Sequence, residues 1–211
     1  MKLYYHPLSC FCQKVLIALY ENGTAFEPHV VDLFDDASSS AFRALWPIGK
    51  FPVLCDGERI VPESSIIIEY LNDVYPGTVA LVPRDAEFAR EVRLRDRFFD
   101  LHVAERMQKI VTDRLRPARE SDRFGVEDAK RRLGIAYEFA DRTMSSRTWA
   151  AGDRFSMADC AAAPALFFAN LVVPFGDSRP NLAAYLSRLA ERPSVARAFE
   201  EALPFLERVP K

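Results

Sequence analysis

The sequence has no uninterrupted apolar stretch of the length that a membrane-spanning helix needs. Its first seven residues, MKLYYHP, are too few and too polar for a secretory signal, and they follow a strand pattern instead. Only 4 cysteines occur in 211 residues, which is too few for a disulfide framework in a chain of this length. These shortages predict a cytoplasmic protein with no membrane partner.

The chain also lacks a strong net charge. Its 28 basic and 30 acidic residues leave a net charge of −2, and residues 1–77 hold 5 basic against 10 acidic side chains. The basic excess beyond residue 77 is scattered along helical segments with acids in between, which is typical of a solvated helix face. We therefore expect no nucleic-acid partner.

Metal-ligating residues are sparse and poorly spaced for a metal site. Cys10 and Cys12 have no second cysteine pair at finger-like spacing, and the 3 histidines are scattered along the chain. A structural zinc site needs about four such ligands, and a disulfide between Cys10 and Cys12 would close a very tight ring. The sequence therefore predicts no metal. Cys12 falls on the apolar stripe of a helix, which favours a buried packing role.

What the chain does contain begins with alternating strand and helix signals. KLYYH is typical of a short strand, and apolar residues at 12–19 then recur with a helical period. Two short apolar runs flank Asp56-Gly57, a strong hairpin signal, and Pro62-Glu63-Ser64 opens a further helix. The order β-α-β-α-β-β-α predicts an α/β domain over residues 1–77.

The rest of the chain, residues 85–211, is helical in pattern and predicts an all-α domain. A long helix is expected at about 86–115, before Pro117. Ser156-Met157-Ala158-Asp159 has the form of a capping box ahead of an apolar run. The fold class is therefore α/β followed by all-α.

Four segments, taken together, resemble the glutathione transferase family. They are YYHPLSCFCQKV at the first strand–helix turn, PIGKFPVL before the hairpin, PESSIIIEYL at the third helix and FSMAD at the capping box. The resemblance, to bacterial cytosolic members, implies a thioredoxin-like glutathione-binding domain at 1–77 and a helical domain at 85–211 that lines an electrophile site. It also implies a detoxifying homodimer that conjugates glutathione, a co-substrate, to small hydrophobic electrophiles with no other cofactor.

The resemblance assigns glutathione-binding residues as well. A helix N-terminus offers free N–H groups to a carboxylate, so Ser64 is expected to hold the γ-glutamyl carboxylate and Glu63 the ammonium. The Phe51–Pro52 bond is expected to be cis, which would turn the backbone of Val53 toward the peptide as in an added strand. Lys50 is placed to neutralise the glycyl carboxylate. The plainer alternatives are a helix cap for Ser64 and an ordinary surface lysine for Lys50.

Three candidate catalytic residues crowd the first strand–helix turn. Family members use a tyrosine at the strand end, or a serine or cysteine at the helix start, and Tyr5, Ser9 and Cys10 match these positions. A hydroxyl that donates to the glutathione sulfur at the positive end of a helix lowers the thiol pKa, which favours Ser9. Cys10 at the same terminus would itself be acidified and would form a mixed disulfide with glutathione. Tyr5 is expected to pack or to support binding.

The electrophile pocket is expected on the long helix of the second domain. Phe99, His102 and Arg106 follow one another at helical spacing, so one face would present them to the first helix. His102 by itself is more often a structural histidine. Two other functions stay open: a glutathione-dependent thiol–disulfide oxidoreductase that uses Cys10, and a binding or scaffold protein without turnover.

Overall fold

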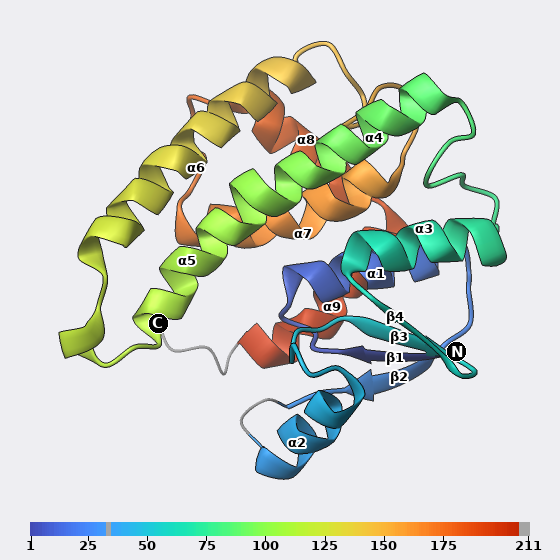
Figure 1. Ribbon diagram of the computed structural model, residues 1–211. Helices are drawn as coiled ribbons and strands as arrows, with labels where there is room; N and C mark the ends of the chain where they lie inside the picture. The colour runs from blue at the N-terminus through green and yellow to red at the C-terminus, as the bar shows by residue number, and fades with distance from the viewer. Residues whose placement is uncertain (33–34, 207–211) are drawn as a thin grey trace.

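The computed structural model describes residues 1–32 and 35–206. A small sheet with its helices packs beneath a group of longer helices (Figure 1). The elements of the first part are β1 (Lys2–Tyr5), α1 (Cys10–Glu21), β2 (Glu27–Val30), α2 (Asp36–Leu45), β3 (Val53–Asp56), β4 (Arg59–Pro62) and α3 (Ser64–Val74). This order, β-α-β-α-β-β-α, confirms the predicted thioredoxin-like α/β domain.

The four strands form one mixed sheet in the order β2-β1-β3-β4. β1 runs parallel to β2 and antiparallel to β3, and β3 runs antiparallel to β4 across the turn at Gly57, where φ is +58°. Tyr4, Val53 and Pro62 lie in register on adjacent strands. The chain after β1, the chain before β3 and the chain after β4 therefore leave the sheet at the same end.

The second part of the chain is helical, as the sequence predicts. Its elements are α4 (Ala86–Phe98), the π-helical turn η1 (Phe99–Ala104), α5 (Glu105–Arg114), the short 3-10 helix η2 (Ala118–Glu120), α6 (Arg123–Met144), α7 (Met157–Val172), α8 (Pro180–Ala190) and α9 (Pro193–Leu206). α4, η1 and α5 follow one another without a break and form the long helix expected at about 86–115. The π-helical turn in its middle was not expected.

Helix α7 is the centre of the core. Most of its side chains are buried, many of them alanines that allow close approach, and it packs on α1 and on the long helix. The predicted capping box is confirmed: the Asp159 carboxylate accepts the Ser156 N–H at 2.9 Å. Asp159 also accepts the Tyr185 hydroxyl at 2.6 Å and the Ala150 N–H at 2.8 Å. One buried carboxylate thus fixes the start of α7 and the loop before it.

Residues 75–85 connect the two parts without helix or strand. The boundaries expected at residues 77 and 85 stay a prediction. In the part of the chain that the structure describes, no helix is long and apolar enough to cross a membrane. Within the same residues, no three His, Cys, Asp or Glu side chains gather as metal ligands would.

Candidate active site

Ser9 stands at the turn from β1 into α1. It is the N-cap of α1, with extended backbone (φ −80°, ψ 121°), and its N–H donates to the His6 carbonyl at 3.0 Å. Its half-buried hydroxyl accepts the Cys12 N–H at 3.4 Å, a long bond for a helix cap. Ser9 therefore lies at the positive end of the helix with a hydroxyl that is only loosely held.

Cys10 faces the interior of the protein. It is 7% exposed, and its thiol donates to the Pro164 carbonyl of α7 at 3.7 Å. Burial raises the pKa of the Cys10 thiol, and the charge of Asp100 raises it further. The expectation that the helix terminus acidifies Cys10 is wrong, because desolvation against α7 outweighs the dipole. Its assignment as a catalytic residue stays a prediction.

Cys12 behaves as the buried apolar residue that the helical stripe predicts. It is fully buried, and the His6 N–H donates to its Sγ at 3.4 Å. Burial raises the pKa of this thiol to about 12, although a hydrogen bond from the Ser9 side chain opposes the shift. The Ser9 hydroxyl is thus shared with Cys12.

The loop before β3 brings a cis peptide to the same end of the sheet. The Phe51–Pro52 bond is cis, which confirms the prediction. Val53 is fully buried and has Tyr4 on one side and Pro62 on the other. The expected strand-like pairing of a ligand at Val53 is therefore wrong, since both edges there are occupied.

Phe51 offers the backbone position that Val53 does not. It lies outside the sheet register, which begins at Val53, and it is half-buried beside the turn that carries Ser9. Lys50 is exposed and stands next to it, as a carboxylate-binding lysine requires.

Helix α3 begins at the same end of the sheet, immediately after β4. Its N-cap, Glu63, has φ +68° and ψ 121°, and the Glu63 side chain makes no capping hydrogen bond. A positive φ in a residue other than glycine is sterically costly, and such strain gathers at ligand-binding sites. Ser64, the first helical residue, is 6% exposed, and its hydroxyl has no hydrogen-bond partner within residues 1–32 and 35–206.

Three aromatic rings that the sequence did not reveal form a wall beside the β1–α1 turn that carries Ser9. The His6 ring stacks on Phe51 at 6.0 Å between centroids and meets the edge of Phe205, from α9, at 5.4 Å. His6 Nδ1 accepts the Leu8 N–H at 3.2 Å, and burial lowers the pKa of His6. His6 therefore joins the Ser9 turn, the cis-proline loop and the last helix.

Tyr5, the third catalytic candidate, points into the core. It is 8% exposed, and burial raises the pKa of its phenol. A neutral, enclosed tyrosine agrees with the expectation of packing rather than chemistry.

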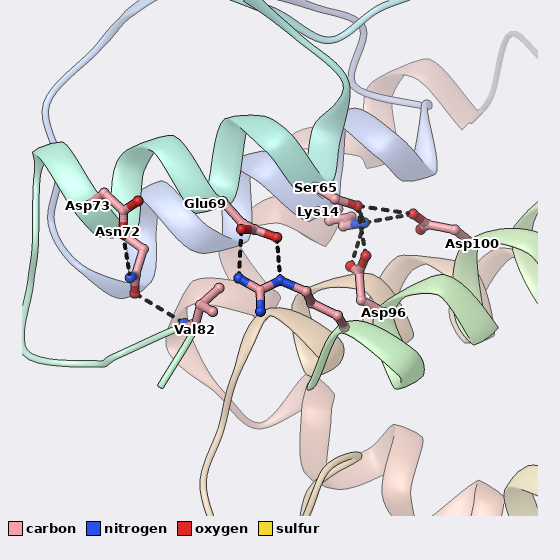
Figure 2. A network of polar contacts seen from close by, with 9 residues as sticks. Lys14, Ser65, Glu69, Asn72, Asp73, Val82, Asp96 and Asp100 are labelled. Atoms are coloured by element: carbon pink, nitrogen blue, oxygen red, sulfur yellow. Dashed lines mark hydrogen bonds and ion pairs between the residues drawn. The ribbon is translucent and has the colours of Figure 1, made fainter. Parts of the chain in front are cut away.

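A buried lysine, also missed from the sequence, joins the two domains below the site. Lys14 is 1% exposed, and its Nζ lies 2.6 Å from Asp96 Oδ1 and 2.8 Å from Asp100 Oδ2 (Figure 2). The Nζ also donates to the Ser65 hydroxyl at 2.8 Å, and that hydroxyl donates to Asp96 at 2.7 Å. Burial raises the pKa of Asp100, although Lys14 opposes the shift. Ser65 follows Ser64, so the network supports the start of α3.

A second bridge between the domains lies beside the lysine. Arg93 of α4 donates through two nitrogens to the two carboxylate oxygens of Glu69 on α3, both at 2.8 Å (Figure 2). Arg93, Asp96 and Asp100 thus connect the long helix to α1 and α3 of the first domain.

The structure places Phe99, one of the three predicted electrophile-pocket residues, on the side of the long helix that faces α6, whereas the assignment of His102 and Arg106 to an electrophile pocket stays a prediction. Phe99 is 3% exposed and lines a small hollow with Phe98 and Phe139, on the side of α6. His102 is exposed, with its ring 5.6 Å from that of Phe98, and Arg106 is half-buried. The shared face was inferred from regular helical spacing, which the π-helical turn at Phe99–Ala104 interrupts.

The fold and the site define a class: a thioredoxin-like domain that presents two helix starts and a cis-proline loop at one end of its sheet, followed by a helical domain. Residues 3–78 match the model of the glutathione S-transferase N-terminal domain, and residues 103–193 match that of the C-terminal domain. The chain belongs to the glutathione transferase family.

Individual relatives agree with this assignment. Glutathione S-transferase 3 of Zea mays is 32% identical over 203 residues, which span 92% of this chain and 90% of the relative. The glutathione S-transferase-like protein LUC7 of a Fusarium species is 30% identical over 191 residues, 88% of this chain and 86% of its own. A glutathione S-transferase from Methylobacillus flagellatus, solved with glutathione bound, is 25% identical with a TM-score of 0.85 and covers 93% of this chain and 98% of its own.

Proposed function

We propose that the chain is a transferase that conjugates the thiolate of glutathione to small hydrophobic electrophiles. The observation that carries this proposal is the start of α3, where Glu63 holds φ +68° without capping the helix and the Ser64 hydroxyl is unpaired within the described residues. Free N–H groups at a helix N-terminus bind a carboxylate. The strain at Glu63 is explained if a ligand uses that geometry.

Glutathione would lie along the end of the sheet. Its γ-glutamyl carboxylate meets the α3 N-terminus and Ser64, and its ammonium meets the exposed Glu63. The backbone of Phe51 pairs with the cysteinyl peptide, and Lys50 neutralises the glycyl carboxylate. Together these contacts match the groups of glutathione, a peptide with two carboxylates, one ammonium and one thiol.

The chemical step falls to Ser9. Its hydroxyl turns from Cys12 to the bound sulfur and donates a hydrogen bond, while the α1 terminus adds positive potential. Both effects favour the thiolate, so the thiol proton leaves to solvent near neutral pH. The thiolate then attacks an electrophilic carbon: the C–S bond forms, and with an aryl halide the halide departs with the electrons of the carbon–halogen bond. His6, Phe51 and Phe205 offer an apolar wall for that electrophile.

A thiol–disulfide oxidoreductase is the second candidate, and a scaffold without turnover is the third. The buried, weakly acidic Cys10 speaks against the second, because thiol exchange needs an accessible thiolate. The strained α3 start speaks against the third, since a scaffold has no use for it.

We also propose a homodimer. Leu94 and Phe98 lie one helical turn apart on α4, and the ring centroids of Phe98 and of Phe139 on α6 are 5.1 Å apart. Leu94, Ile135 and Phe139 are 58%, 58% and 40% exposed, which leaves apolar surface for a second copy to cover. Light scattering at micromolar concentration checks this, and a monomer contradicts it.

The compartment and the biological role extend the same proposal. Cys10, Cys12, Cys55 and Cys160 are all free thiols, which agrees with a reducing cytoplasm. Detoxification is the role that a transferase for hydrophobic electrophiles would serve there.

Two assays on the same protein test the activity. Conjugation of glutathione to an activated aryl halide is expected, with reduction of a glutathione mixed disulfide weak or absent. The opposite ranking favours the oxidoreductase, and tight glutathione binding without either activity favours the scaffold.

A further inference from the structure

The turn between β1 and α1 holds a histidine whose backbone is bound on both sides. The Ser9 N–H donates to the His6 carbonyl at 3.0 Å, which closes a four-residue turn. The first and last Cα atoms of such a turn lie within about 7 Å of each other. The His6 N–H also donates to Cys12 Sγ at 3.4 Å. Both polar backbone groups of His6 are therefore engaged, and its side chain starts from a fixed position near the Ser9 hydroxyl.

Hydrogen bonding within the turn also fixes which nitrogen of the His6 ring carries the proton. Nδ1 accepts the Leu8 N–H at 3.2 Å. A nitrogen that accepts an N–H carries no proton of its own, so the single ring proton lies on Nε2. Burial lowers the pKa of His6 and so favours this uncharged form, although the charge of Asp32 opposes the shift. His6 thus presents an Nε2–H donor without a formal charge.

Nε2 is the ring nitrogen that the protein leaves without a partner. Its N–H has no acceptor within residues 1–32 and 35–206, and the His6 side chain is half-buried. Polar groups that are withdrawn from water are nearly always hydrogen-bonded in folded proteins. A half-buried donor with no protein acceptor is therefore available to a bound molecule.

Two phenylalanines set the chemical character of the space beside the His6 ring. Phe51 of the cis-proline loop stacks on it with 21° between the planes and 6.0 Å between centroids. Phe205 of α9 lies at 76° to it, with centroids 5.4 Å apart. All three rings are half-buried, so together they offer apolar surface and one hydrogen-bond donor. Apolar neighbours strengthen a hydrogen bond to a developing charge, because little water competes for it.

We propose that His6 is a catalytic residue for one class of electrophile, α,β-unsaturated carbonyl compounds that carry a flat apolar substituent. This inference rests on the proposed function and names the substrates that the site favours. The substituent packs on Phe51 and Phe205, and the His6 Nε2–H donates to the carbonyl oxygen. The glutathione sulfur at Ser9 attacks the β-carbon of the same molecule.

The atoms and electrons of this step balance without a further reactant. The thiolate, whose proton has left to solvent, forms a C–S bond to the β-carbon, and the electrons of the C=C bond move toward the carbonyl oxygen to give an enolate. The Nε2–H stabilises that oxyanion through its hydrogen bond and keeps its proton. The α-carbon then takes a proton from solvent, which restores the carbonyl. Loss of one such donor to an oxyanion usually costs about 100- to 1,000-fold in rate.

Two electrophiles with the same phenyl ring test the assignment. Benzylideneacetone has the carbonyl oxygen, whereas benzyl chloride has no oxygen. His6→Phe keeps an aromatic ring but removes the donor, so it is expected to lower kcat/KM for benzylideneacetone about 100-fold and to change that for benzyl chloride less than about threefold. The Kd for glutathione should stay the same. Equal losses with the two electrophiles overturn the proposal, because they indicate that the ring merely positions the Ser9 turn.

Conservative variants locate the donor on the ring. Glutamine places its amide nitrogen near the position of Nε2, whereas asparagine reaches only that of Nδ1. His6→Gln is therefore expected to retain about tenfold more activity toward benzylideneacetone than His6→Asn. The reverse order overturns the proposal. His29→Phe, at an exposed histidine on β2, is the matched control and should leave both activities unchanged. A loss there equal to that of His6→Phe also overturns the assignment.

A spectroscopic measurement tests the donor without turnover. Long-range ¹H–¹⁵N correlation spectra of the labelled protein, assigned by comparison with His6→Phe, are expected to show the proton of His6 on Nε2. The opposite tautomer overturns the proposal. Conjugation of benzyl chloride without conjugation of benzylideneacetone overturns it as well and leaves the transferase function standing. Failure with both of these electrophiles and with an aryl halide overturns the inference and the proposed function together.

Discussion

The starts of α1 and α3 emerge from the same end of the sheet, yet the two helices begin in opposite ways. At α1 the N-cap Ser9 is extended, with φ −80°, and its hydroxyl accepts an N–H of the first turn. At α3 the N-cap Glu63 has φ +68°, and no side chain caps the helix. An ordinary cap stabilises a helix by about 1 kcal/mol, so α3 gives up a stabilisation that α1 retains.

The difference indicates two roles for two similar helix ends. In the proposed function, the uncapped α3 terminus keeps its N–H groups for an anionic ligand, whereas the α1 terminus keeps a hydroxyl that can turn to a neighbouring sulfur. Lys14 of α1 and Ser65 of α3 connect the two ends through one hydrogen bond at 2.8 Å. Substitutions can therefore disturb the connection, the α1 end or the α3 end in turn.

Breaking the connection should have the largest effect. Lys14→Met leaves Asp96 and Asp100 buried without their cation, and removing one partner of a buried ion pair costs about 3–5 kcal/mol of unfolding free energy. Urea denaturation at pH 7.5 measures this loss.

The loss should depend on pH in a defined direction. The pKa of Asp100 is already raised by burial, and without Lys14 it rises further, so the folded variant binds more protons than the unfolded chain. The unfolding free energy of the variant must then fall as pH rises above the ordinary carboxyl pKa, which makes pH 5 milder than pH 7.5. Lys130→Met, at an exposed ion pair on α6, is the control and should change stability little. A pH-independent loss contradicts the explanation.

Disturbing the α1 end should affect turnover and leave binding intact. Ser9→Ala is expected to lower kcat for aryl halide conjugation by about 100-fold, the usual consequence of losing one donor to a developing or resident anion. The kinetic pKa should rise, because the bound thiol loses a hydrogen bond that favours its charged form. A pH–rate profile and the Kd for glutathione separate the two effects.

Cys10→Ala is the matched variant one residue further on. It should keep its activity, and no glutathione adduct at Cys10 should appear by mass spectrometry of the native protein, because the thiol faces Pro164. If the effects of the two variants are exchanged, Cys10 is the catalytic residue and the site must open further than its burial indicates.

Disturbing the α3 end should weaken glutathione binding and leave turnover intact. Ser64→Ala is expected to raise the Kd for glutathione about tenfold, since a hydrogen bond to a charged group is worth about 1.5–3 kcal/mol and the backbone N–H groups remain. The turnover of the saturated enzyme should change little. Calorimetric titration checks this, with Ser187→Ala on the exposed face of α8 as the control. An unchanged Kd makes Ser64 part of the helix start only.

The features that could be predicted from the sequence depend on residues that are neighbours along the chain. The strand–helix order, the hairpin at Asp56-Gly57 and the capping box at Ser156–Asp159 each depend on a few consecutive side chains. Ser9, the cis-proline loop and Ser64 were predicted at one place only through the resemblance to the family; the strand directions, which bring the end of β1, the start of β3 and the end of β4 together, are seen in the structure alone.

The features that were missed depend on partners far along the chain. Lys14 is buried only because Ser65 and Asp100 meet it from 51 and 86 residues away, and Cys10 is buried by Pro164, 154 residues away. A single lysine in the apolar run CFCQKVLIAL was the available signal for the network. No local signal marks the π-helical turn that rearranges the faces of the long helix.

The substitution with the smallest expected effect tests the difference between the two helix starts most directly, because it replaces Glu63, the residue with the unusual backbone conformation at the start of α3. Glu63→Gly should raise the unfolding free energy by about 1 kcal/mol, since glycine adopts a positive φ without the steric cost of about 1–3 kcal/mol but loses more chain entropy on folding. Glutathione should bind more weakly at the same time, because the carboxylate that meets its ammonium is gone.

Glu63→Ala separates the two contributions. It removes the same carboxylate but retains a Cβ, so glutathione affinity should fall as in Glu63→Gly while the stability gain is absent. Urea denaturation and calorimetric titration of both variants give the two quantities side by side. If glycine and alanine yield the same unfolding free energy, the positive φ carries no strain. The two helix starts then differ in their side chains alone. The residues around Glu63 in that case hold the uncapped start of α3 without lowering the unfolding free energy.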